Sequence, residues 1–99
     1  MTVGFRKKNL RKLYEKHAFC QQKLDQAVCR KYIQRVNLIK AARDFGEFRA
    51  LPGLACHLLE PKHRGFWAVK LTGFYRLIIS VDEDLNEITI EDVVKHYGD

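Results

Sequence analysis

The chain has 99 residues, which is enough for one domain built around one hydrophobic core. Hydrophobic residues make up 46% of it and aromatic residues 11%, and this composition excludes an intrinsically disordered chain. The net charge of +6 is concentrated in residues 1–50, which carry 13 Lys and Arg against 4 Asp and Glu. Such a basic half attracts polyanions, either RNA or an acidic partner segment, although a basic face kept for solubility has the same composition.

Targeting signals and cysteine spacing indicate the compartment. No apolar segment follows the charged residues Arg6–Lys8, so we expect no signal peptide. No apolar run approaches the ~20 residues that cross a bilayer, and we therefore expect a soluble cytoplasmic protein that does not contact a membrane. Cys20, Cys29 and Cys56 form no CxxC pair and lack zinc-finger spacing, so we expect free, partly buried thiols.

The first half of the chain predicts a short strand followed by helices. Thr2–Phe5 is apolar enough for an edge strand, and the spacing of apolar residues in Asn9–Lys16 predicts a helix. Apolar residues then recur every three or four positions across Gln21–Ala42, which predicts one long amphipathic helix that ends at Asp44–Gly46. Its basic face would carry Lys23, Arg30, Lys31, Arg35 and Lys40.

The second half of the chain has the period of β-strands. Four segments rich in β-branched and aromatic residues are separated by short turns: Ala55–Glu60, Phe66–Leu71, Tyr75–Val81 and Glu87–Val94. Short connections between consecutive strands predict an antiparallel meander. The sequence therefore predicts a single α+β domain over residues 1–99, with the N-terminal short strand and the helices packed on one face of that meander.

Alternation along the strands predicts which side chains point away from the core. If Trp67 and Leu77 face the core, Lys70 and Arg76 lie on the open face of the sheet. His57 lies on the first strand of the meander. An irregularity in the last strand would place 95–97 at the end of the sheet. These positions could bring imidazole, cationic and phenol groups into one concave area.

These residue types suit cleavage of RNA without a metal ion. The reaction needs a base for the 2′-hydroxyl proton, cations for the pentacoordinate phosphorane and an acid for the leaving 5′-oxygen. We predict no metal site, because the acidic run 82–84 lies in a turn and lacks ligand spacing. The catalytic candidates are His57, Arg76, His96 and Tyr97, and the RNA-binding candidates are Lys62, His63, Arg64, Lys70 and Lys95. His57 could instead be a structural histidine, and 62–64 a solvated hairpin tip.

Two segments carry a resemblance to a known family. LPGLACHLLEPKHRGFWAVKLTGFYRLII, at 51–79, contains a Pro-Gly turn, His57 followed by Leu58, a basic hairpin, a Trp-X-Val-Lys strand and a Tyr-Arg-Leu strand. GFRKKNLRKLYE, at 4–15, is a short strand that leads into a basic helix. Both resemble the HigB, or plasmid maintenance killer, branch of the RelE/HigB superfamily of bacterial type II toxins.

The resemblance implies a fold similar to microbial ribonucleases and an endoribonuclease that cleaves mRNA in the A site of the 70S ribosome, beside 16S rRNA. It also implies a HigA-like helix-turn-helix antitoxin. The toxin itself would not bind operator DNA and would be carried there only by this antitoxin. His57 and Arg76 match the family's histidine and transition-state arginine, and the last catalytic residues would fall at 95–97. Many HigB proteins have Asp-Tyr-His there, and a lysine where this chain has Glu60, so the acid and base roles stay open.

Two other functions fit parts of the sequence. A non-catalytic toxin on the same fold, similar to the ParE branch that poisons DNA gyrase, would need no histidine and tyrosine at the strand ends. A DNA-binding regulator would need a helix-turn-helix pair, for which the four strands of the second half leave no room.

Overall fold

The computed structural model describes residues 1–59 and 65–95 and confirms the predicted α+β class. Its elements are β1 (Thr2–Phe5), α1 (Lys8–Glu15), α2 (His17–Lys23), α3 (Gln26–Ala41), α4 (Phe45–Arg49), β2 (His57–Leu58), β3 (Phe66–Lys70), β4 (Tyr75–Asp82) and β5 (Glu87–Lys95). Within these described ranges, no helix has both the length and the apolar character needed to cross a membrane.

The sheet has the strand order β1-β5-β4-β3-β2. Strands β2 to β5 pair antiparallel with their neighbours, as the predicted meander requires. Strand β1 pairs parallel with β5, from Thr2 opposite Glu87 to Phe5 opposite Ile90, so the sheet is mixed. This pairing places the start of the chain beside the last described strand.

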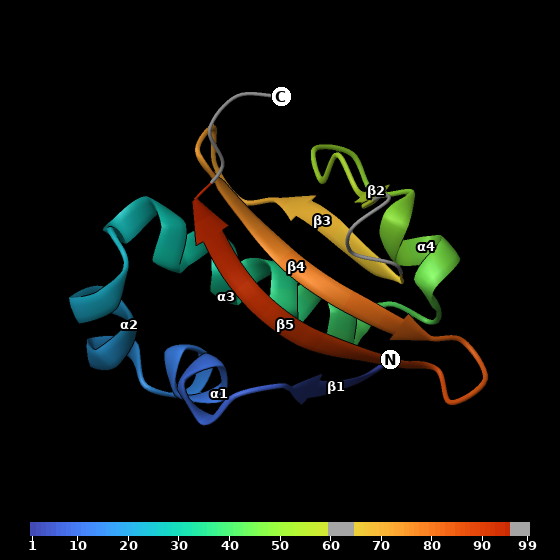
Figure 1. Ribbon diagram of the computed structural model, residues 1–99, viewed down its shortest axis with the longest axis horizontal. Helices are drawn as coiled ribbons and strands as arrows, with labels where there is room; N and C mark the ends of the chain where they lie inside the picture. Colours follow the sequence, from blue (N-terminus) through green and yellow to red (C-terminus); the bar gives the residue numbers. More distant parts are fainter. Residues whose placement is uncertain (60–64, 96–99) are drawn as a thin grey trace.

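The core lies between α3 and one face of the sheet, and Figure 1 shows α3 behind β4 and β5. From α3, Val28, Tyr32, Val36 and Ile39 recur at helical spacing and are fully buried. The sheet contributes the buried side chains Val69, Leu77, Ile79, Ile88 and Ile90. The hydroxyl of Tyr32 donates a 2.6 Å hydrogen bond to the carbonyl of Leu10, which ties α3 to α1. In Figure 1 the face of the sheet toward the viewer carries no helix.

The prediction of one helix over Gln21–Ala42 is wrong, because Asp25 starts a new one. The side chain of Asp25 accepts a 2.9 Å hydrogen bond from the backbone N–H of Val28, and it therefore caps the N-terminus of α3. Leu24, with φ −127° and ψ 149°, has extended backbone and separates α2 from α3. An aspartate three residues before a capped N–H was a helix-start signal that the apolar periodicity obscured.

Two further predictions about α3 are wrong. Arg35 was placed on the basic face, but only 7% of it is exposed, and its Nε donates to the carbonyl of Lys70 at 3.0 Å. Gly46 does not end the helix: α3 ends at Ala41, and Gly46 lies inside α4. The start of α4 is capped by Asp44, whose side chain accepts from the N–H of Glu47 at 2.8 Å.

The prediction of free thiols at Cys20 and Cys29 is also wrong. A disulfide joins these two residues, whose Cα atoms are 5.8 Å apart, and it connects α2 to α3. Both side chains are buried. Cys56 is free, and burial raises the pKa of its thiol to about 11, so it is protonated at neutral pH.

We predict that Asp25→Ala destabilises the protein by about 1 kcal/mol, because the N-terminus of α3 loses its cap. Asp25→Asn should retain most of the stability, since the amide oxygen can still accept from Val28. Urea unfolding of the three proteins measures the difference. Equal losses for Ala and Asn would contradict a capping role.

Candidate functional site

The register of the strands confirms the predicted alternation on β3 and β4. Lys70 lies opposite Arg76, and Ala68 lies opposite both His57 and Ile78. Side chains of paired residues point to the same face. These residues therefore share the open face of the sheet, which we define as the face away from α3.

The open face is hollowed into a cleft of about 480 Å³. Among the described residues, its polar lining is Arg6, Lys7, His57, Arg76, Glu91 and Asp92. Its apolar lining is Leu59, Phe66, Ala68, Ile78 and Val94. Three permanent cations, two carboxylates and an imidazole thus surround an apolar floor, which is a suitable composition for a ligand that is both anionic and ring-containing.

A β-bulge in β5 brings both carboxylates into the cleft. Ile78 pairs with Asp92 while the next residue, Ile79, pairs with Ile90, so Glu91 is the extra residue on β5. Without the bulge, Glu91 and Asp92 would point to opposite faces of the sheet. With it, both line the cleft, and the predicted irregularity in the last strand is confirmed.

Glu91 is held by side chains from both sides of β5. Its carboxylate accepts hydrogen bonds at 2.9 Å from both Nε and Nη2 of Arg6, and at 2.6 Å from the hydroxyl of Ser80. Only 8% of Glu91 is exposed. The hydrogen bond from Arg6 lowers the pKa of Glu91, although burial acts in the opposite direction. Glu91 is therefore ionised at neutral pH.

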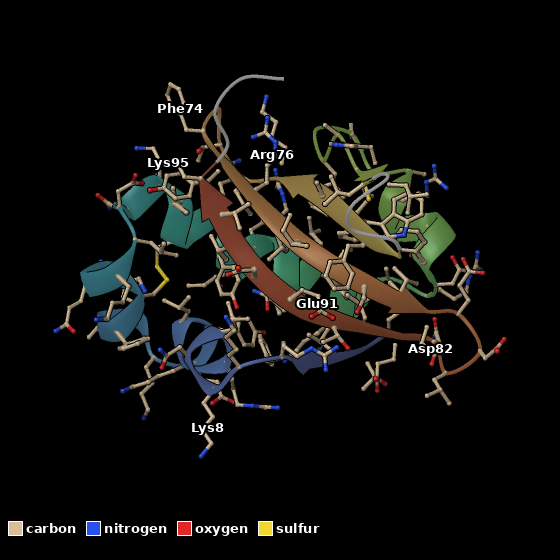
Figure 2. All side chains as sticks on the ribbon, viewed as in Figure 1. Lys8, Phe74, Arg76, Asp82, Glu91 and Lys95 are labelled. Atoms are coloured by element: carbon tan, nitrogen blue, oxygen red, sulfur yellow. A yellow bond between two sulfur atoms is a disulfide. The ribbon has the colours of Figure 1, made fainter. Side chains whose placement is uncertain are left out.

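Arg76 is half-buried and lies in the cleft rather than in the hydrophobic core. Its Nη1 donates to the carbonyl oxygens of Thr72 at 2.7 Å and Tyr75 at 3.0 Å, with a longer contact to Gly73 at 3.4 Å. These contacts fix the guanidinium at the β3–β4 turn, and Figure 2 shows Arg76 toward that end of the sheet. Since they use Nη1, the remaining nitrogens can reach an anion in the cleft.

His57 lies at the other side of the cleft, on the short edge strand β2. Its Nδ1 is 3.0 Å from the carbonyl oxygen of Ala55. Because a carbonyl can only accept, Nδ1 carries the proton in this contact, and Nε2 of the neutral ring is free to accept one. Ala55 has a φ of 45°, a left-handed conformation that turns the chain two residues before the histidine.

Lys70 and Lys95 lie outside the lining of the cleft. Lys70 is exposed beside Arg76 on the open face. Lys95 lies opposite Tyr75, whose side chain packs against the core, so its register places it on the other face at the end of β5. Of the predicted residues, His57 and Arg76 both line the cleft.

The remaining predicted site residues, Lys62, His63, Arg64, His96 and Tyr97, lie outside the described residues. Their assignment to RNA binding and catalysis stays a prediction.

The sequence did not indicate Arg6, Lys7, Glu91 and Asp92 as residues of the site. The signal for Glu91 was present, since an acidic pair interrupts the β-branched segment at 88–94. Nothing in the sequence links Glu91 to Arg6, which is 85 positions away and reaches it through the parallel pairing of β1 with β5.

Across residues 1–59 and 65–95, no three His, Cys, Asp or Glu side chains are grouped so that they could hold a metal ion.

The ionised Glu91 makes stability depend on pH. Its folded pKa lies below the ordinary value of 4.5, so its stabilising contribution is present above pH 4.5 and is lost as the pH falls through the folded pKa. We predict that Glu91→Gln is less stable than the wild type at pH 7 and that the difference shrinks on acidification to pH 3. Urea unfolding at both pH values tests this, and a difference independent of pH would contradict it.

Comparisons with known proteins show the family and the fold of this chain. A family model described as a RelE-like toxin of the type II toxin–antitoxin system HigB matches residues 3–94. Among proteins with curated descriptions, none matches significantly.

Solved structures share the fold at low identity. A YoeB/ParE toxin from Agrobacterium tumefaciens superposes with a TM-score of 0.68 at 14% identity, covering 98% of this chain and 100% of that one. The YoeB–YefM complex from Staphylococcus aureus gives 0.65 at 16% identity, with 98% of each chain covered. The protein HP0894 from Helicobacter pylori gives 0.58 at 17% identity, covering 97% of this chain and 94% of that one.

Proposed function

Because the chain belongs to the HigB-like group of RelE-like toxins from type II toxin–antitoxin systems, we propose that it is a ribosome-dependent endoribonuclease that cleaves mRNA and stops translation. The observation that carries the proposal is that His57 and Arg76, which come from separate strands, line one cleft on the open face. A proton-transfer group and a fixed guanidinium on one surface supply two of the parts that phosphodiester cleavage needs.

The cleft residues can take the following roles in the reaction. A base removes the proton of the ribose 2′-hydroxyl, and the 2′-oxygen attacks the phosphorus while the bond to the 5′-oxygen breaks. An acid then protonates the leaving 5′-oxygen. Nε2 of His57 can serve in either proton transfer, and Arg76 offsets the charge of the phosphorane. The second proton-transfer group is predicted at His96 or Tyr97, and no metal ion is needed for this chemistry.

Partners follow from the family and from the charge distribution. We propose a HigA-like helix-turn-helix antitoxin that neutralises the toxin in the cytoplasm and alone carries it to operator DNA. The exposed basic side chains Arg30, Lys31, Lys40 and Arg43, together with the predicted contacts at 62–64, Lys70 and Lys95, would bind mRNA and 16S rRNA near the ribosomal A site. Lys70 stands at the rim of the cleft beside Arg76, where a strand of RNA leaving the cleft would pass.

We predict that Arg76→Ala lowers the rate of mRNA cleavage by about 10²-fold or more, because the phosphorane loses a preorganised cation. His57→Ala should lower it by about 10²-fold, the usual contribution of one proton-transfer group. The measurement is the rate of cleavage of a defined mRNA on purified 70S ribosomes, followed by primer extension. Both variants should also arrest growth less than the wild type does when they are induced.

Cleavage should persist in the presence of EDTA with magnesium restored only to the level that ribosomes require. Retention of full cleavage by Arg76→Ala would show that the cleft is not the active site. Growth arrest without new mRNA ends, but with accumulation of relaxed plasmid DNA, would instead favour a gyrase poison of the ParE type.

A further inference from the structure

A second arginine reaches the cleft from the strand on the other side of β5. Arg6 directly follows β1, and its backbone N–H donates to the carbonyl of Ile90 at 2.9 Å, so it continues the pairing of β1 with β5. Strands β1 and β4 flank β5 on opposite sides. Arg6 and Arg76 therefore approach the cleft from opposite sides of β5.

The contacts of Arg6 leave part of its guanidinium available. Nε and Nη2 donate to the two oxygens of Glu91, and within the described residues Nη1 has no hydrogen-bond acceptor. The side chain of Arg6 is 61% exposed, whereas that of its partner Glu91 is only 6% exposed. The carboxylate of the pair is thus buried and fixed, whereas the guanidinium is exposed to solvent and can contact a ligand.

Glu91 is built to hold this guanidinium in place. The bulge turns it into the cleft, and the hydroxyl of Ser80 fixes the oxygen that also accepts from Nη2 of Arg6. A bidentate pair fixes the plane of the guanidinium, which a single contact would not do. An ion pair whose only role was to join β1 to β5 would not need its cation exposed in a cleft beside Lys7.

The two guanidinium groups are anchored at different places along β5. Arg76 is held at the β3–β4 turn, beside Val94 of β5, whereas Arg6 is held over Glu91, three residues earlier on that strand. Three residues of a strand span about 10 Å, so we expect the two guanidinium groups to reach different phosphates. Figure 2 shows Arg76 and Glu91 at separate places along the sheet.

We propose that Arg6 binds a second phosphate of the single-stranded RNA, next to the one at Arg76, and that Glu91 is the positioning residue that aims it. The inference rests on the proposed function and extends it from one phosphate to two. The cleft would then fix the direction of the RNA strand, because only one phosphate would lie beside His57 and Arg76. The bases between the two phosphates would lie over the apolar floor at Ala68 and Ile78.

Binding of a short 2′-O-methylated single-stranded RNA at several salt concentrations tests Arg6. Each phosphate contact on single-stranded nucleic acid contributes about 0.7 to the slope of log Kd against log salt. We expect Arg6→Ala to weaken binding about tenfold at low salt and to reduce that slope by about 0.7. Arg6→Lys should keep the slope, since the positive charge stays. It should lose part of the affinity for RNA, because a lysine cannot form the bidentate contact with Glu91 that orients the side chain.

Arg11→Ala is the matched control. Arg11 is also an exposed arginine paired with a carboxylate, Glu15 at 3.7 Å, but it does not line the cleft. It should change RNA binding less than threefold. If Arg6→Ala only lowers the melting temperature and binds RNA as Arg11→Ala does, Arg6 is a structural residue and the inference is wrong.

Glu91→Gln separates positioning from simple charge. Removal of a negative charge from the cleft should tighten RNA binding if Glu91 has no other role. If Glu91 aims Arg6, cleavage of mRNA on the ribosome should instead slow by about tenfold, with the melting temperature checked in parallel. Unchanged or faster cleavage by Glu91→Gln would overturn the positioning role.

The controls also distinguish the two proposals. If the wild type neither binds nor cleaves RNA, the proposed function is wrong and the inference falls with it. If the wild type binds and cleaves RNA and Arg76→Ala does not cleave it, but Arg6→Ala acts as the wild type does, only the role of Arg6 is overturned.

Discussion

The structure depends on one constraint: the sheet is covered by helices on one face only. One face must therefore pack in the hydrophobic core, while the other is open to solvent. Toward α3, Leu77, Ile79 and Ile90 are fully buried and supply the hydrophobic stabilisation of a small domain. On the open face the same strands place Arg76 and Ile78 around a cleft. Because the side-chain period is two, stability and the candidate site are encoded in alternate residues of the same strands.

The bulge at Glu91 is the point where this simple division is modified. It lets β5 return to the core at Val93, opposite Leu77, after placing both Glu91 and Asp92 on the open face. Bulges often occur beside active sites because they redirect side chains without ending a strand. Here the carboxylate of Glu91 accepts hydrogen bonds from Arg6 and Ser80, which lie on opposite sides of β5. The cleft therefore contains an ion pair whose geometry is fixed from both sides.

Local patterns predicted most of the fold, but of the polar residues that line the cleft they predicted only His57 and Arg76. Alternation depends only on the residues of the strand itself, and it therefore predicted that Arg76 lies on the open face. The break at Asp25 was missed, because the apolar periodicity continues across the capped start of α3. The ion pair of Arg6 with Glu91 could not be predicted, since it depends on the parallel pairing of the first strand with the last and on the register of a bulge. Both are tertiary properties that no local segment contains.

The central claim is that the open face of the sheet, rather than the basic helices, binds the phosphodiester. The most direct measurement is an NMR titration of the isotope-labelled protein with a short 2′-O-methylated single-stranded RNA, following the backbone amides and the arginine Nε–H groups. The account predicts that the largest shifts fall on His57, Ser80, Glu91 and the side chains of Arg6 and Arg76. Shifts confined to the exposed residues of α3, with the cleft unchanged, would contradict it.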